Sequence, residues 1–188
     1  MFEDYPKEIM TKDGTPILLR PLVPEDEQCL ADFFSRIPEN ERWFLREDLA
    51  DPAVISQWIQ NLDYNRIVPI VAVRQEDGAI IGNVRLHRRP ADCLRHIAHL
   101  RIMVDPEYRQ QRIGTWMLLD TIKLAMNMGI ETLVAEFVEG VEDAARNAAH
   151  KLDFFQQAVL KDYVKDRQGK YRDLIIMTKT LQRDWSDF

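Results

Sequence analysis

The apolar residues of this 188-residue chain recur with two different periods, and these periods predict its strands and helices. Short runs rich in Val, Ile and Leu, bounded by Pro, Gly and Asp, are typical of strands. Runs in which apolar residues return every three or four positions are typical of helices. The predicted strands are residues 15–21, 66–75, 79–87, 94–104, 133–138, 154–164 and 171–181. The predicted helices are residues 24–37, 51–61, 113–128 and 141–152.

Capping and turn residues mark several ends of these elements. Asp51 followed by Pro52 predicts a helix N-terminus, and Gly129 predicts the end of the helix over residues 113–128. The turn Glu76-Asp77-Gly78 joins two strands directly and predicts a hairpin. Strands and helices therefore alternate irregularly along the chain. This mixture predicts an α/β sandwich with a mixed sheet.

Composition and charge narrow the class of protein. Hydrophobic residues make up 46% and charged residues 30%, which is ordinary for a folded globular protein. From the length of 188 residues we expect one domain over residues 1–188, with a short C-terminal tail from about residue 182. The net charge of −6 disfavours nucleic acid or an anionic membrane as a partner. No apolar run approaches the roughly 20 residues that cross a bilayer, and the first residues carry no apolar signal segment. Cys29 and Cys93 cannot build a disulfide framework, so we expect a cytoplasmic location.

The segment Val104-Asp105-Pro106-Glu107-Tyr108-Arg109-Gln110-Gln111-Arg112-Ile113-Gly114-Thr115 carries the strongest chemical signal. A predicted strand ends at its beginning, and a long predicted helix starts near its end. A helix N-terminus offers unpaired backbone N–H groups and the positive end of a dipole, which together make an anion site. Gly114 lets the backbone approach a ligand closely, because no Cβ stands in the way. This segment therefore predicts a site for a phosphate-bearing ligand.

The same segment resembles the acyl-CoA loop of the GNAT superfamily of N-acetyltransferases. In that family an Arg or Gln is followed three residues later by Gly, and a Gly or Ala comes two residues after that. Here Arg109 and Gly114 match the first and last of these positions, and Arg112 replaces the middle Gly. Leu19-Arg20-Pro21, the Asp77-Gly78 turn, Phe154 after the late helix and the segment over residues 166–177 are also similar to the family. The resemblance extends over about 160 residues.

This resemblance implies a fold, an activity and a co-substrate. The fold would be a mixed, mostly antiparallel central sheet with helices on both faces. The activity would be direct transfer of an acetyl or other acyl group from acetyl-CoA to an amine, with no metal. The residues expected to bind the CoA moiety are Met103, Val104, Arg109, Gln110, Gln111, Arg112, Ile113, Gly114 and Thr115.

Charge in this part of the chain fits an anionic ligand. Residues 85–112 hold seven arginines, no lysine and three acids, whereas the rest of the chain is acidic. For Arg109 and Arg112, at the start of the helix, we favour contact with the ligand. For Arg88, Arg89 and Arg95, near a turn, a solvated hairpin rim is the simpler interpretation. Arg112 could reach a phosphate oxygen, or it could block the groove of a decayed site.

Two side chains are candidates for the base that neutralises the amine. His99 stands where many GNAT relatives carry a Glu, and a histidine titrates near neutrality. Its alternative role is structural. Glu136 lies in an apolar strand, and its alternative is the exposed face of an edge-like strand. The Tyr that often serves the family as acid is replaced by Ala149. His96 and His99 fall on opposite faces of one strand, so we expect no metal site.

Arg112, His99 and Ala149 differ from the residues usual in the family, so more than one function remains open. The first hypothesis is an active acetyltransferase whose partner is a small-molecule or peptide amine. The second is a catalytically degenerate module that binds acyl-CoA or regulates another protein. The third is an interaction domain without a ligand. For self-association, a homodimer is the form we expect.

Overall fold

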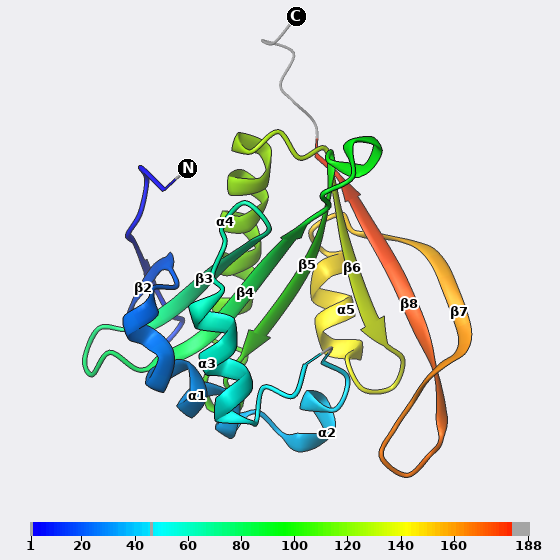
Figure 1. Ribbon diagram of the computed structural model, residues 1–188, viewed down its shortest axis with the longest axis horizontal. Coiled ribbons are helices and arrows are strands. Elements are labelled where there is room, and N and C mark those ends of the chain that lie inside the picture. Colours follow the sequence, from blue (N-terminus) through cyan, green and yellow to red (C-terminus); the bar gives the residue numbers. More distant parts are fainter. Residues whose placement is uncertain (1, 46, 182–188) are drawn as a thin grey trace, which may run out of the picture.

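The computed structural model describes residues 2–45 and 47–181 and has one eight-stranded sheet at its centre (Figure 1). The strands are β1 (Lys7–Met10), β2 (Pro16–Pro21), β3 (Ile67–Arg74), β4 (Ile80–Arg88), β5 (Ile97–Val104), β6 (Thr132–Val138), β7 (Phe155–Lys165) and β8 (Tyr171–Thr180). They lie in the order β1-β2-β3-β4-β5-β6-β8-β7. All neighbours pair antiparallel except β5 and β6, which are parallel. The predicted tail from about residue 182 lies outside the described residues.

Helices cover both faces of the sheet. They are α1 (Glu27–Arg36), α2 (Glu39–Arg42), α3 (Pro52–Gln60), α4 (Ile113–Asn127) and α5 (Asp143–His150). Buried residues of α1 and α3, such as Phe33, Phe34 and Ile55, pack in one cluster with Val71 of β3. Buried residues of α4 and α5 belong to a second cluster on the other face. Each face of the sheet thus has its own apolar core, as the burial of large apolar side chains favours.

The predicted fold class is confirmed: the sheet is mixed, mostly antiparallel and covered by helices on both faces. The turn over residues 76–78 joins β3 and β4 in an antiparallel hairpin, as predicted. The Asp51 side chain accepts a hydrogen bond from the Ala53 N–H (2.8 Å) at the start of α3, which confirms that cap. The strand predicted from residue 94 begins instead at Ile97, because Asp92–Leu94 forms a 3-10 turn.

Strand β1 has no counterpart among the predicted elements, because its four residues, KEIM, are too few to show a period. Contacts from distant residues hold it in place. Lys7 Nζ lies 2.5 Å from Asp120 Oδ1 on α4, and the Tyr5 hydroxyl donates to the same carboxylate. Burial and the neighbouring Asp120 raise the pKa of Tyr5, so its hydroxyl keeps its proton and remains a donor.

The position of β6 corrects one alternative considered from the sequence. An edge-like strand was one interpretation of the segment that contains Glu136. In the structure β6 lies between β5 and β8, in the interior of the sheet.

No helix in the described part of the chain combines the length and apolar character needed to cross a membrane.

Candidate active site

Strands β5 and β6 pair for only part of their length. The parallel register runs from Ile97 opposite Thr132 to Leu100 opposite Ala135. Beyond this point β5 continues to Val104 and β6 to Val138, and the two strands diverge. A cavity of about 480 Å³ lies at the divergence and is lined by both strands, by the start of α4 and by α5. The break in pairing creates a cavity inside an otherwise continuous sheet.

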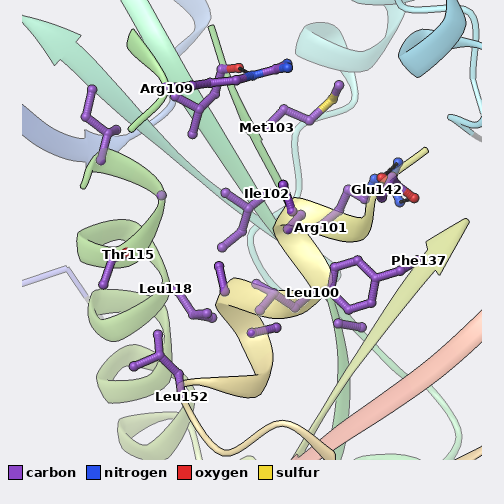
Figure 2. A pocket seen from close by; sticks show the side chains of 18 of the residues that line it. Leu100, Arg101, Ile102, Met103, Arg109, Thr115, Leu118, Phe137, Glu142 and Leu152 are labelled. Atoms are coloured by element: carbon purple, nitrogen blue, oxygen red, sulfur yellow. Dashed lines mark hydrogen bonds and ion pairs between the residues drawn. The ribbon is translucent and has the colours of Figure 1, made fainter. Parts of the chain in front are cut away.

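Small side chains on α5 leave room for this cavity (Figure 2). Ala144, Ala145, Ala148 and Ala149 all line it, and these positions share one face of the helix. Larger apolar side chains such as Leu118 of α4 line it as well. The alanine-rich sequence that predicted a helix over residues 141–152 therefore has a second role, because longer side chains there would fill the cavity.

The loop before α4 has an unusual backbone. Gln110 has a φ of 62° and Arg112 a φ of 67°, both in the left-handed region. An L-residue pays roughly 1–2 kcal/mol for this conformation, which glycine adopts without strain. Arg112 also stands directly before the first helical residue, Ile113. The left-handed backbone at residue 112 would therefore suit a glycine, and Arg112 adopts the same conformation at a cost in free energy.

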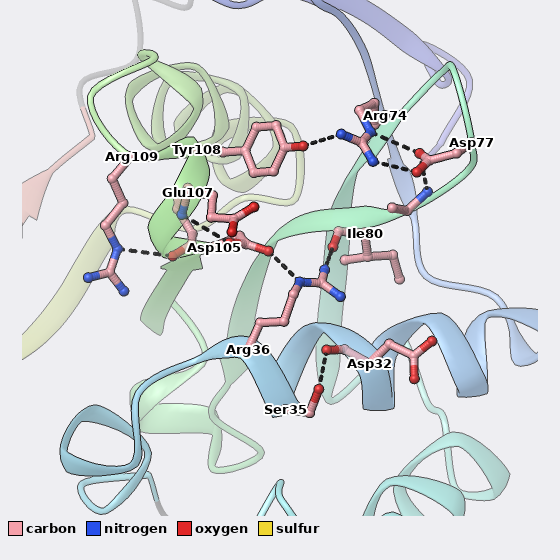
Figure 3. Close-up of polar contacts among 12 residues, drawn as sticks. Asp32, Ser35, Arg36, Arg74, Asp77, Ile80, Asp105, Glu107, Tyr108 and Arg109 are labelled. Carbon is pink, nitrogen blue, oxygen red and sulfur yellow. Dashed lines mark hydrogen bonds and ion pairs between the residues drawn. The ribbon is translucent and has the colours of Figure 1, made fainter.

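An ion pair with α1 and a hydrogen bond from the β3–β4 hairpin hold the loop in place (Figure 3). The Asp105 side chain is 1% exposed and accepts a hydrogen bond from Arg36 Nε of α1 at 2.5 Å. Arg36 also donates to the Ile80 carbonyl, at 2.7 Å, at the start of β4. On the other side, Arg74 of β3 donates to the Tyr108 hydroxyl and pairs with Asp77. The loop is thus fixed to both α1 and the β3–β4 hairpin.

Arg109, which we expected to meet the ligand, has a protein partner. Its two terminal nitrogens lie 2.9 and 2.7 Å from the two carboxylate oxygens of Glu41, on α2. Its Nε also donates to the Val104 carbonyl at 3.2 Å (Figure 3). Such a bidentate pair is among the stronger and more directional ion pairs. Arg109 and Glu41 both line the cavity, so this pair forms part of its wall next to α2.

Arg101 occupies the space between the diverging strands (Figure 2). Its Nη2 lies 2.7 Å from Glu142, the residue before α5, and its Nη1 donates to the Glu136 carbonyl at 3.4 Å. Glu142 in turn accepts a hydrogen bond from the Val138 N–H at 2.9 Å. The Nε of Arg101 is buried and has no hydrogen-bond partner. Arg101, which lines the cavity, therefore keeps one buried N–H donor without a partner.

The two candidate bases lie next to each other. His99 of β5 and Glu136 of β6 are on the same face of the sheet, and His99 Nδ1 is 3.7 Å from Glu136 Oε1. Glu136 lines the cavity, and its side chain is 30% exposed. His99 is not among the lining residues and stands beside Glu136. Its Nε2 lies 2.7 Å from Arg89, which reaches it from the end of β4.

Most of the residues predicted to bind CoA do line the cavity. They are Met103, Val104, Arg109, Gln110, Arg112, Ile113, Gly114 and Thr115. Gln111 is not among the lining residues, and its carbonyl accepts a hydrogen bond from the Lys12 N–H at 3.3 Å. The helix position that we compared with the family Tyr holds Ala149, which is buried and lines the cavity.

Sequence reasoning missed Glu41, Arg101 and Glu142 as residues of the site. Glu41 is 68 positions away from its partner Arg109, and no local pattern connects the two. Glu142 lies in the first turn of the helix predicted over residues 141–152, where an acid is common because it interacts favourably with the helix dipole. Arg101 gave a signal, since an Arg in the middle of an apolar strand needs a partner or a ligand.

A second cavity of about 270 Å³ adjoins the first, and Glu41 and Val141 line both. Its other walls come from the segment around α2, including Trp43 and Phe44, and from the β7–β8 turn, including Asp166 and Arg167. The Trp43 side chain donates to the Lys165 carbonyl at 2.7 Å and so joins the two walls.

Within residues 2–45 and 47–181, no group of three or more His, Cys, Asp or Glu side chains is arranged to hold a metal ion.

Comparison with known proteins places this site in a family. The sequence profile of the Acetyltransferase (GNAT) family matches residues 30–154. The acetyltransferase PA5475 of Pseudomonas aeruginosa is 26% identical over 145 residues, which cover 74% of this chain and 73% of that protein.

Solved structures share the fold. A GNAT-family acetyltransferase from Streptococcus pneumoniae matches with a TM-score of 0.76 at 21% identity, over 87% of this chain and 99% of that one. A phosphinothricin acetyltransferase from Sinorhizobium meliloti, solved in complex with AcCoA, matches with a TM-score of 0.74 at 19% identity, over 90% and 91% of the two chains. The profile match covers more than half of the sequence and includes the loop, the diverging strands and all of α5. This chain therefore belongs to the GNAT family of acetyltransferases.

Proposed function

We propose that this protein transfers the acetyl group of acetyl-CoA to an amine within the cavity between β5 and β6. One observation carries the proposal. A single cavity extends from the N-terminus of α4, where an anion would bind, to the Glu136 carboxylate, where an amine would bind. Proteins of similar structure are named for different amines: one is a phosphinothricin acetyltransferase and another a ribosomal-protein-alanine N-acetyltransferase. The acceptor class proposed here is accordingly a small-molecule or peptide amine.

The residues at the α4 end fit the diphosphate of CoA. The N–H groups of Ile113, Gly114 and Thr115 are in the first turn of the helix and have no carbonyl four residues earlier within it. A Cβ built on Gly114 would lie 3.5 Å from Val104, so the absence of a side chain leaves that part of the cavity open. Arg112 adds a guanidinium suited to phosphate.

The diverging strands fit the middle of the same ligand. Met103 on β5 and Phe137 on β6 lie beyond the last parallel pair, and both residues line the cavity. Strand edges of this kind offer N–H donors and C=O acceptors to the amide groups of an extended ligand. When bound, acetyl-CoA supplies the thioester whose acetyl group is transferred.

The chain's own contribution to the chemistry is to hold the amine and remove its proton. An amine that attacks a thioester must first be neutral. Glu136 and His99 are the two side chains proposed for this step: Glu136 lines the cavity, and His99 adjoins it. Arg101, with its unpaired buried Nε, lies two residues from His99 along β5 and is proposed to donate to negative charge that develops near the thioester.

The second cavity is proposed to hold the rest of the acceptor. It shares Glu41 and Val141 with the first, so an acceptor placed there has access to the proposed donor site. Trp43 and Phe44 offer apolar surface, and Asp166 and Arg167 offer charges of both signs.

A cytoplasmic location belongs to the same proposal, because Cys29 and Cys93 are both free thiols.

The proposal is tested by titrating the protein with acetyl-CoA in a calorimeter and then by measuring CoA thiol release with a panel of amines. We expect saturable binding, which Gly114→Trp abolishes because its side chain fills the cavity. Leu119→Trp, on the exposed side of α4 and outside the cavity lining, is the matched control and retains binding. Binding without thiol release from any amine would instead support the degenerate module. An absence of binding would support a domain without this ligand.

A further inference from the structure

The imidazole of His99 lies between charged side chains from two other strands. Its Nε2 is 2.7 Å from Arg89 Nη2, just past the end of β4, and its Nδ1 is 3.7 Å from Glu136 Oε1 on β6. The sequence pattern does not separate Arg89 from Arg88, its neighbour on the hairpin rim. The antiparallel register of β4 and β5, with His87 opposite His99, is what brings Arg89 within reach.

Hydrogen-bond chemistry fixes the proton positions on this ring. A guanidinium group has only donors and keeps its charge in proteins, so Arg89 donates and the Nε2 of His99 accepts with its lone pair. The single proton of the neutral imidazole then lies on Nδ1, on the side of Glu136. A second proton on Nε2 would place two N–H donors and two positive charges 2.7 Å apart. The ring therefore has no lone pair with which to take a proton from an amine.

We infer that Arg89 holds His99 in the neutral Nδ1–H tautomer, that His99 and Arg89 are positioning residues, and that the Glu136 carboxylate is the general base of the proposed acetyl transfer. The inference rests on the proposed function for this last role. In the step itself an N–H bond of the acceptor ammonium breaks, an O–H bond forms on Glu136, and the electron pair stays on the amine nitrogen. The Nδ1–H dipole of His99 points its positive end at that carboxylate and orients it.

The other charges around the ring favour the same state. His87 of β4 lies directly opposite His99, and Arg101 stands two residues along β5 on the same face. Arg101 and Arg89 both oppose a further positive charge on His99, whereas Glu136 favours one. The contact with Arg89 is 1 Å shorter than the contact with Glu136, and it directly occupies Nε2.

The tautomer is tested by nitrogen-15 NMR of the histidine side chains between about pH 6 and 8, the range in which an ordinary histidine loses its charge. In the wild-type protein we expect Nε2 of His99 to stay unprotonated throughout. In Arg89→Met, Nε2 becomes able to protonate, and the nearby Glu136 favours the charged ring. Arg88→Met is the matched control, because Arg88 donates to the Asn65 carbonyl, and it should behave as the wild type does. Protonation of Nε2 in the wild type, or the same titration in all three proteins, would overturn the inference.

The positioning role is tested by kcat against pH with an amine that the protein acetylates. Arg89→Met should lower kcat on the order of 10-fold and leave the KM for acetyl-CoA unchanged, as loss of an orienting group does. It should also add a new ionisation to the pH profile, and Arg89→Lys should restore much of the rate, since an ammonium can also donate to Nε2. An unchanged profile in Arg89→Met would refute the positioning role. If no amine is acetylated, the proposed function fails, and the NMR experiment still decides the tautomer.

Discussion

At the scale of single residues, Arg112 combines a strained backbone with a useful charge. Its left-handed conformation costs roughly 1–2 kcal/mol. Arg112→Gly removes this strain but makes the unfolded chain more flexible, at about 0.4–1 kcal/mol. We therefore expect a net gain of roughly 0.5–1 kcal/mol in the free energy of unfolding, measured with urea. Arg112→Ala is the control, because alanine keeps the strain and should bring no gain.

The same substitutions should act in the opposite direction on ligand binding. If the guanidinium contacts a phosphate of acetyl-CoA, both Arg112→Gly and Arg112→Ala weaken binding in the calorimeter. The loss should shrink as salt is raised, because the contact is ionic. Tighter binding in either variant would show that Arg112 obstructs the groove. A stability gain together with an affinity loss would mark a residue retained for binding.

The assignment of the base can be tested by two matched substitutions on neighbouring strands. Glu136→Gln and His99→Gln both keep the approximate size of the side chain and remove its ability to take up a proton. If Glu136 is the base, Glu136→Gln lowers turnover by ~10²-fold or more, the usual effect of losing general-base catalysis. His99→Gln should lower it much less, and neither change should alter the affinity for acetyl-CoA. The reverse order of the two effects would make His99 the base.

From the sequence, a residue could be assigned to the cavity wall where its signal was local. The loop over residues 109–115 contains its own turn and helix start, so all but Gln111 of its members could be placed at the cavity. Arg89 and Glu41 could not be identified, because their partners lie on other elements and only the folded register brings them together. Side-chain orientation within the loop also depended on the two left-handed residues, which local propensity does not predict.

At the scale of elements, the stability of the β3–β4 hairpin depends on pH in the acid range. Hydrogen bonds from Arg74 and from the Ala79 N–H lower the pKa of Asp77 to about 2. An unfolded aspartate titrates near 3.9, so this stabilisation is complete above about pH 4 and is lost as pH falls toward 2. In Asp77→Asn, the urea midpoint of unfolding should change less between pH 4 and pH 2 than it does in the wild type. Glu76→Gln, in the same turn, is the control, and its urea midpoint should depend on pH as that of the wild type does.

The order and type of the predicted elements were obtained from periodicity, turns and caps, and their ends were less accurate. Strand β5 begins three residues later than predicted, because a 3-10 turn can carry the same apolar residues as the start of a strand. Strand β1 was missed because its four residues show no period, and its contacts with Asp120 form only in the fold. The divergence of β5 and β6 has no sequence signature, because both strands keep their apolar residues past the last pair.

At the scale of the whole molecule, the pair between Glu41 and Arg109 links the two cavities. Glu41 is on α2, which borders the proposed acceptor site, and Arg109 is on the proposed donor loop. Glu41→Gln removes the charge of this contact, so we expect faster amide hydrogen exchange over residues 39–45. The free energy of unfolding should change by no more than ~1 kcal/mol, because the pair is partly exposed.

The matched control for this prediction is Glu39→Gln, whose partner Arg167 lies on the β7–β8 turn. It should leave exchange in the donor loop unchanged, whereas Glu41→Gln should speed exchange there as well. Equal exchange in the donor loop of both variants would show that α2 and the loop are not coupled.

A homodimer stays a prediction, and size-exclusion chromatography with light scattering would test it.

The short pairing of β5 with β6 also affects how this molecule comes apart. Four residue pairs join a meander of five strands to a block of three. Cooperative units of unequal stability are common in folded proteins, and they often coincide with such substructures. Under mild denaturant the two blocks should open at this junction before either one unfolds. Any ligand that binds only while the two strands are together raises the free energy of that opening, by an amount that grows with its concentration relative to its Kd.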